Sequence, residues 1–204
     1  AMICEDGTMY GEEYTLVTVA DYVLKHTPGN TVSNLSSTRA LRDVTRQYGC
    51  TYNAAAVGEV NVVTKMKETG AVIGGEGNGG VIYPESHYGR DALVGIALML
   101  TYLAKKGMKT SELRATYPPY CIAKNRIDLT PGTDVDAILA KVKDIYSNEE
   151  VNDVDGVKID FPDKWVHLRK SNTEPIIRVY SEAATMDEAD QLGKDIMNVI
   201  LSMI

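Results

Sequence analysis

The sequence predicts an α/β domain followed by an α+β domain. As far as residue 106, short strand patterns alternate with helical patterns of roughly ten to fifteen residues, an alternation typical of sheets with helices on both faces. We therefore expect a mixed α/β/α sandwich there. Beyond residue 120, a strand and a helix precede a run of short strands and a last helix. This order favours an antiparallel sheet with two covering helices. The 204 residues are enough for two domains, each with a core.

The elements of the first domain follow from apolar periodicity and from glycines that end helices. We expect helices over 12–25, 39–48, 59–69 and 91–106, a short helix from residue 110, and strands over 31–33, 50–54, 71–74 and 81–83. Ser36, Ser37 and Thr38 offer N-cap hydroxyls for the second helix. The helix over 91–106 is too short in its apolar part to span a bilayer. We expect it to pack against the sheet through Leu93, Ile96, Ala97, Leu100, Leu103 and Ala104.

The second domain is expected to begin near Tyr117-Pro118-Pro119-Tyr120, a stiff, helix-incompatible segment suited to an interdomain hinge. Strands are expected over 121–129, 151–154, 157–161, 165–168 and 176–182, and a helix over 134–146. Thr185 and Glu188 form a capping-box pattern for the final helix. The chain begins inside an apparent strand. We therefore assign 1–10 to the remnant of a preceding domain, with a terminal hairpin as the alternative, 11–116 to the α/β domain and 117–204 to the α+β domain.

Composition excludes some classes of function. The 21 Lys and Arg against 28 Asp and Glu give a net charge of −7, which argues against general binding to nucleic acid or anionic membranes. Cys4, Cys50 and Cys121 stand far apart without metal-ligand spacing, so we expect buried free thiols. No signal-peptide pattern opens the chain, and we expect a cytoplasmic protein. His26, His87 and His167 are more simply explained as structural or solvated than as catalytic, although His87 lies near a glycine-rich segment.

Residues 169–175, Arg-Lys-Ser-Asn-Thr-Glu-Pro, which we name the arginine loop, lie between two strand patterns. A guanidinium gives two-point hydrogen bonding to phosphate, and hydroxyls add donors. Asn172 tolerates a backbone that turns amides towards an anion. We therefore predict phosphate binding by Arg169, Ser171, Asn172 and Thr173, with Arg178 on the next strand a weaker candidate. From these residues alone, an ordinary polar hairpin is an equal alternative.

Residues 74–80, Gly-Gly-Glu-Gly-Asn-Gly-Gly, which we name the glycine loop, follow a short apolar strand. Glycines let the backbone approach a ligand closely, while the carboxylate of Glu76 and the amide of Asn78 suit sugar hydroxyls. The spacing also matches a dinucleotide-binding fingerprint, but a strand pattern and Pro84 follow where that motif needs a helix. We interpret that match as accidental.

Both loops resemble motifs of the α-D-phosphohexomutases, the phosphomannomutase/phosphoglucomutase family. The arginine loop resembles the phosphate-binding Arg-x-Ser-Gly/Asn-Thr-Glu-Pro loop of the fourth domain, and the glycine loop resembles the Gly-Glu-x-Ser/Asn-Gly-His/Gly sugar loop of the third. Val57-Gly58-Glu59 before a helix also fits. Two departures concern sugar choice: Ala56 stands where a basic residue is frequent, and Gly80 where many members have His.

The resemblance implies a C-terminal fragment of an enzyme that interconverts hexose 1-phosphate and hexose 6-phosphate through a bisphosphorylated intermediate. The family's phosphoserine loop and its Mg²⁺ loop are absent from this sequence, so no catalytic residue and no metal ligand is assigned here. Mg²⁺ and hexose 1,6-bisphosphate are implied for the full-length enzyme, with a phosphosugar and the missing N-terminal domains as partners. By the same resemblance, Glu76 and Asn78 hold the sugar, the arginine loop holds the phosphate, and closure at the hinge brings full affinity.

Two alternatives stay open at this point. The fragment could belong to a phosphoglucosamine mutase, because Glu76 and Asn78 do not settle how the C2 substituent is accommodated. It could also be a non-catalytic phosphosugar-binding or regulatory module. We expect the fragment alone to be inactive.

Overall fold

The computed structural model describes residues 1–130, 132–171 and 173–203, and divides into two compact units, Ala1–Pro118 and Pro119–Ile204. The unit boundary lies within the proline segment. Among the described residues, no helix combines the length and apolar character needed to cross a membrane. The assignment of 1–10 to a preceding domain stays a prediction. In the structure, these residues lie within the first unit, and the Tyr10 and Thr18 hydroxyls form a buried hydrogen bond of 2.6 Å there.

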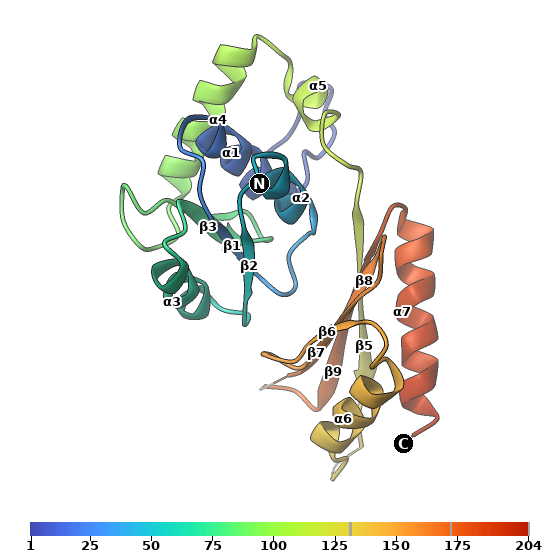
Figure 1. Ribbon diagram of the computed structural model, residues 1–204. Coiled ribbons are helices and arrows are strands. Elements are labelled where there is room, and N and C mark those ends of the chain that lie inside the picture. Colours follow the sequence, from blue (N-terminus) through green and yellow to red (C-terminus); the bar gives the residue numbers. More distant parts are fainter. Residues whose placement is uncertain (131, 172, 204) are drawn as a thin grey trace. The chain divides into compact units, whose positions relative to one another are not determined.

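The first unit is an α/β/α sandwich, as the sequence predicts (Figure 1). Its sheet has the order β2-β1-β3-β4, in which β1 is parallel to β2 and β3 while β4 is antiparallel to β3. The strands are β1 (Thr31–Asn34), β2 (Tyr52–Ala55), β3 (Ile73–Glu76) and β4 (Gly80–Ile82). The helices are α1 (Glu12–His26), α2 (Ala40–Gln47), α3 (Glu59–Thr69), α4 (Ala92–Lys106) and α5 (Thr110–Arg114).

Helices cover the sheet of the first unit on opposite faces. Val32 of β1 packs in one apolar cluster with Val62 and Met66 of α3. Its neighbour Thr31 faces the other way, because its hydroxyl lies 2.6 Å from the hydroxyl of Thr45 on α2. All residues of the two adjacent strands β1 and β3 are buried, as expected for strands that helices cover on both faces.

Helix α4 packs through a different face from the predicted one. Leu93, Ile96 and Leu100 are 78%, 53% and 59% exposed, whereas Gly95, Met99 and Tyr102 are buried. The cause is close approach at Gly95, where a Cβ would lie 3.3 Å from the side chain of Val81. The predicted packing face is therefore wrong, because the helix approaches the sheet through its smallest residue. Of the six residues predicted to pack against the sheet, only Leu103 is half-buried, and the exposed ones are Leu93, Ile96, Ala97, Leu100 and Ala104.

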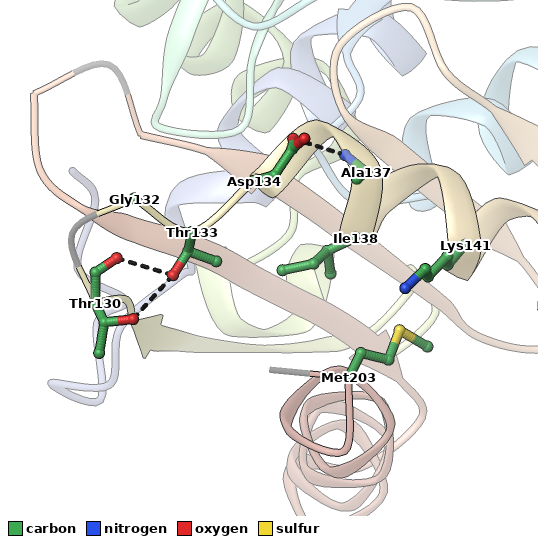
Figure 2. A pocket seen from close by; sticks show the side chains of 8 residues that line it. All are labelled: Thr130, Gly132, Thr133, Asp134, Ala137, Ile138, Lys141 and Met203. Carbon is green, nitrogen blue, oxygen red and sulfur yellow. Dashed lines mark hydrogen bonds between the residues drawn. The ribbon is translucent and has the colours of Figure 1, made fainter.

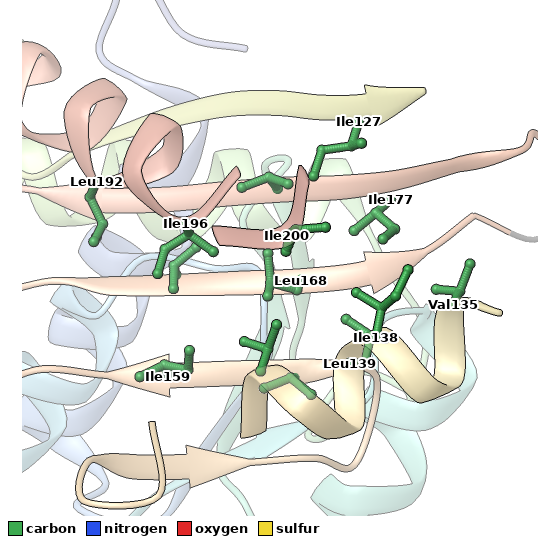
Figure 3. Close-up of a cluster of buried hydrophobic side chains, with 14 residues drawn as sticks. Ile127, Val135, Ile138, Leu139, Ile159, Leu168, Ile177, Leu192, Ile196 and Ile200 are labelled. Carbon is green, nitrogen blue, oxygen red and sulfur yellow. The ribbon is translucent and has the colours of Figure 1, made fainter. Parts of the chain in front are cut away.

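The second unit has an antiparallel sheet of order β5-β9-β8-β7-β6, as predicted. The strands are β5 (Cys121–Asp128), β6 (Glu150–Asn152), β7 (Val157–Asp160), β8 (Trp165–Lys170) and β9 (Ile176–Ala183). The helices α6 (Val135–Ile145) and α7 (Met186–Leu201) share a core with one face of this sheet (Figure 3). The capping box at Thr185 and Glu188 is present at the start of α7.

The cysteines are free, but their predicted burial is correct for Cys4 alone. Cys50 and Cys121 are half-buried. Cys121 begins β5 and Cys50 precedes β2, so both lie at strand ends, where solvent reaches the side chain.

Candidate functional site

The glycine loop forms the turn between β3 and β4, at the carboxyl end of β3. Its glycines are required by lack of space. A Cβ on Gly75 would lie 1.9 Å from the carbonyl oxygen of Gly80, and one on Gly77 would lie 2.0 Å from a carboxylate oxygen of Glu13. A side chain at position 75 would therefore require the backbone to move, and one at position 77 would displace the carboxylate of Glu13.

Glu76 is buried, with 5% of its surface exposed. Its Oε1 accepts hydrogen bonds from Asn34 Nδ2 at 2.9 Å and from the backbone N–H of Gly58 at 3.3 Å. Its Oε2 lies 3.2 Å from Nη1 of Arg90. A buried carboxylate needs such partners, since burial without them would strongly disfavour its charge. The orientation of Glu76 is therefore fixed from two sides.

Asn78 is placed differently from Glu76. Its side chain is exposed, and its Oδ1 accepts a hydrogen bond of 3.2 Å from the backbone N–H of Gly80 within the same turn. The amide N–H₂ group makes no hydrogen bond in the described part of the chain. Of the two predicted sugar-binding residues, Glu76 is thus held rigidly and Asn78 lies at the surface of the loop.

The segment after β1 supports the glycine loop, a role that the sequence analysis missed. The hydroxyl of Ser37 accepts a hydrogen bond of 2.9 Å from the backbone N–H of Gly77 and donates one of 2.9 Å to Asn34 Oδ1. Of the three hydroxyls predicted to cap the second helix, that of Thr38 accepts a hydrogen bond of 3.2 Å from the backbone N–H of Ala40 in the first turn of α2. The adjacency of β1 and β3 would have revealed this role, because loops at one edge of a parallel pair lie together.

The arginine loop forms the turn between β8 and β9. The backbone N–H of Ser171 donates to the carbonyl of Ile176 at 3.1 Å and closes the turn. Ser171 is 8% exposed, and its Oγ lies 3.4 Å from both the N–H and the hydroxyl of the exposed Thr173. The predicted ligand Asn172 lies outside the described residues.

Arginines from three strands lie on one face of the second sheet. Arg169 of β8 stands opposite Arg178 of β9, and Arg178 stands opposite Arg126 of β5. Side chains opposite each other in an antiparallel sheet share a face, so these guanidinium groups form a row. Arg126 was not predicted. It could have been found only from the pairing of β5 with β9, which the sequence does not reveal.

The ion pairs of these cations are long. Arg169 Nη1 lies 3.5 Å from Asp155 Oδ2, and Arg178 Nη2 lies 3.5 Å from Glu174 Oε2. Lys170 Nζ lies 3.4 Å from Asp136 Oδ2, with 53% of its side chain exposed against 27% for Arg169. Contacts of this length at partly exposed sites stabilise little. They keep the cations near the loop and leave them able to bind an anion.

Asp155 is brought to Arg169 by a close approach of two backbones. A Cβ on the next residue, Gly156, would lie 2.1 Å from the carbonyl oxygen of Leu168. In addition, Nε2 of the buried His167 donates to the Asp155 carbonyl at 2.7 Å. Burial lowers the pKa of His167 from 6.5 to about 4, so at neutral pH it is an uncharged structural donor beside the arginine row.

Two of the three histidines lie at the surface of the first unit. His26 is exposed, and the half-exposed His87 lies 2.9 Å from Asp91. Within the described ranges, no three His, Cys, Asp or Glu side chains are grouped to hold a metal ion. A hollow of about 380 Å³ in the second unit is lined by Thr130, Gly132, Thr133, Asp134, Ala137, Ile138, Lys141 and Met203 (Figure 2). Asp134 there caps α6, and none of the predicted site residues lines it.

Both units match models of known domains. Residues 11–120 match the alpha/beta/alpha domain III of phosphoglucomutase/phosphomannomutase, and residues 126–199 match its C-terminal domain.

Curated relatives carry names from this group of mutases. A phosphoglucosamine/phosphogalactosamine mutase of Sulfurisphaera tokodaii is 35% identical over 83% of this chain and 38% of its own length. A phosphoglucomutase/phosphomannomutase of Thermococcus kodakarensis is 36% identical over 92% of this chain and 41% of its own length. The chain thus spans about two fifths of these relatives.

Solved structures agree in fold. A phosphoglucomutase/phosphomannomutase family protein of Burkholderia thailandensis superposes with a TM-score of 0.81 at 23% identity, over 98% of this chain and 43% of the other. An Aspergillus fumigatus N-acetylphosphoglucosamine mutase in complex with GlcNAc-6P and magnesium has a TM-score of 0.60 at 15% identity, over 93% of this chain and 46% of its own. With its two domain matches in their order along the sequence, this chain belongs to the phosphoglucomutase/phosphomannomutase family.

Proposed function

We propose that this chain is the substrate-binding C-terminal part of a phosphomannomutase/phosphoglucomutase that interconverts hexose 1-phosphate and hexose 6-phosphate through a bisphosphorylated intermediate. The proposal rests on the family membership and on the chemistry of the two loops. Because the chain spans about two fifths of its relatives, the groups that transfer the phosphoryl group are assigned to the rest of the polypeptide. The chain alone is then inactive.

The observation that carries the proposal is the register that sets Arg169 opposite Arg178 beside a turn bearing Ser171 and Thr173. Two guanidinium groups on neighbouring strands can bind different oxygens of one phosphate, and hydroxyls add neutral donors. In this role, the arginine loop holds the phosphate that is not being transferred. Phosphoryl transfer depends mainly on positioning and charge stabilisation, so a fixed grip on this phosphate contributes directly to catalysis.

The glycine loop is proposed to hold the sugar. Glu76 presents a carboxylate that its protein partners have already oriented, and Asn78 presents an exposed amide 2 residues further on. Hydroxyl groups donate to the first and can donate to or accept from the second. The absence of a Cβ at Gly75 and Gly77 lets the loop pack against the carbonyl of Gly80 and the carboxylate of Glu13.

Magnesium and hexose 1,6-bisphosphate belong to the proposed full-length enzyme. A structure neighbour was solved with GlcNAc-6P and magnesium. The described residues of this chain offer no cluster of metal ligands, and we assign the Mg²⁺ ligands to the preceding domains. The preceding domains are the proposed partner within the same polypeptide, and the cytoplasmic location stays a prediction.

A phosphoglucosamine mutase is a second candidate, favoured by the 35% identical relative of that name. Calorimetric titration of the chain with glucose 6-phosphate, mannose 6-phosphate and glucosamine 6-phosphate separates the candidates. The first proposal predicts tighter binding of the two neutral sugars, and preference for the amino sugar would contradict it. A mutase assay on the same sample should show no conversion of glucose 1-phosphate. Turnover by the pure chain would contradict the assignment of the phosphoryl-transferring groups to the rest of the polypeptide.

A further inference from the structure

We propose that Arg90 is a sugar-binding residue whose free guanidinium edge donates a hydrogen bond to a ring hydroxyl of the hexose. The inference deepens the proposed function, since it adds a specificity-determining residue to the glycine loop. Arg90 lies just before α4 and outside the glycine loop.

The position of Arg90 is fixed by two carboxylates. Its backbone N–H donates to Glu59 Oε1 at 2.9 Å, and its Nε donates to Glu59 Oε2 at 2.9 Å. These two hydrogen bonds, led by the backbone one, lower the pKa of Glu59, so that this carboxylate stays charged. Nη1 lies 3.2 Å from Oε2 of Glu76. The guanidinium is therefore held between a carboxylate at the start of α3 and the buried carboxylate of the glycine loop.

These contacts leave one edge of the guanidinium available. Within the described part of the chain, Nη2 makes no hydrogen bond, and 44% of the Arg90 side chain is exposed. An arginine donates through a rigid planar group, so fixing Nε and Nη1 also fixes the direction of Nη2. A donor oriented in advance loses little entropy when a ligand binds.

Local charge selects the type of ligand group. Glu59 and Glu76 together outweigh the single positive charge of Arg90, and Asp91 follows in the sequence. A second anion such as phosphate is therefore disfavoured here, whereas a neutral oxygen can accept from Nη2 without adding charge. Ring hydroxyls are the neutral acceptors of a hexose phosphate.

Gly80 provides the space that Arg90 occupies. A Cβ on Gly80 would lie 2.6 Å from Cδ and 3.3 Å from Cγ of Arg90. The aliphatic part of Arg90 thus lies directly over the last glycine of the loop, where a larger residue would displace it. The missing side chain at position 80 thus makes room for the aliphatic part of Arg90.

The test is calorimetric titration of the chain with glucose 6-phosphate and its 2-deoxy, 3-deoxy and 4-deoxy analogues. Arg90→Met should weaken glucose 6-phosphate binding about tenfold, the effect of losing one hydrogen bond from a charged donor. The wild type should bind one deoxy analogue more weakly than glucose 6-phosphate, because that analogue lacks the hydroxyl that Arg90 binds. Arg90→Met should bind this analogue and glucose 6-phosphate equally well. Arg46→Met, which removes an exposed arginine on α2, is the matched control. It should change neither the affinity for glucose 6-phosphate nor the weaker binding of the deoxy analogue.

The pattern across the analogues separates hydroxyl binding from mere support of the loop. If Arg90→Met weakens all ligands equally and keeps every deoxy penalty, Arg90 acts only on the fold and the inference is wrong. Unchanged binding by Arg90→Met also overturns it. If this variant does not fold, Gly80→Ala decides by the same criteria, because its added methyl group displaces Arg90 without removing it. Absence of binding by the wild type would contradict the proposed function, and the inference would fall with it.

Discussion

Arg169 and Arg178 lie directly opposite each other on the antiparallel strands β8 and β9. Like charges in such positions destabilise a sheet, and the acidic partners Asp155 and Glu174, both at 3.5 Å, offset this only in part. A bound phosphate would remove the repulsion. The second unit therefore tolerates a local electrostatic cost at the place where the proposed ligand binds.

This arrangement predicts that stability and binding respond differently to Arg178→Gln. Without ligand, the free energy of unfolding should stay the same or rise by up to about 0.5 kcal/mol, because a like-charge neighbour is lost. Affinity for inorganic phosphate should fall about tenfold, since a charge-assisted hydrogen bond is lost. Urea unfolding and calorimetry measure the two effects. A variant that loses stability but keeps phosphate affinity would indicate a structural arginine.

The outward face of α4 predicts an unusual tolerance to polar substitution. Leu93→Ser should change the free energy of unfolding by less than about 0.5 kcal/mol, because the side chain is 78% exposed. Met99→Ala, six residues along on the buried face, should cost about 2–5 kcal/mol. Urea unfolding of the two variants checks the orientation of the helix. A larger cost for Leu93→Ser than for Met99→Ala would contradict it.

His167 predicts acid sensitivity of the second unit. Its pKa is lowered by burial from 6.5 to about 4, so the unfolded state binds a proton that the folded state rejects. The free energy of unfolding should therefore fall as the pH is lowered from 6.5 towards 4. The total loss that His167 causes is up to about 3 kcal/mol.

The His167 prediction is measured by urea unfolding between pH 7 and 4. His167→Gln should flatten this part of the profile, while His26→Gln, at an exposed position, should leave it unchanged. Equal profiles for wild type and His167→Gln would show that His167 is not the group responsible.

The sequence was most informative where the signal is local. Apolar periodicity, helix-ending glycines and the capping box at Thr185 predicted the order and type of the elements, because each depends on neighbours along the chain. The packing face of α4 was not predictable in this way. A small residue can direct close approach more strongly than a row of leucines, and Gly95 does so here.

In the candidate site too, residues within local motifs were predictable from the sequence, and residues that only the fold brings together were not. Glu76 and Arg169 could be selected because they lie within short motifs. Their partners could not, since Asn34 and Arg90 come from other parts of the chain and meet Glu76 only in the folded sheet. Arg126 likewise joins the arginine row through strand pairing.

The central claim is that the arginine loop binds phosphate, and the most direct test is calorimetric titration of the chain with inorganic phosphate in Arg169→Ala and Lys170→Ala. Arg169 lies in the arginine row, whereas Lys170 is its more exposed neighbour, paired with Asp136. We expect Arg169→Ala to lower the affinity at least about tenfold and Lys170→Ala to lower it less than about threefold. Equal losses would contradict the account, because they would show a general attraction of charges rather than a phosphate site built from specific donors.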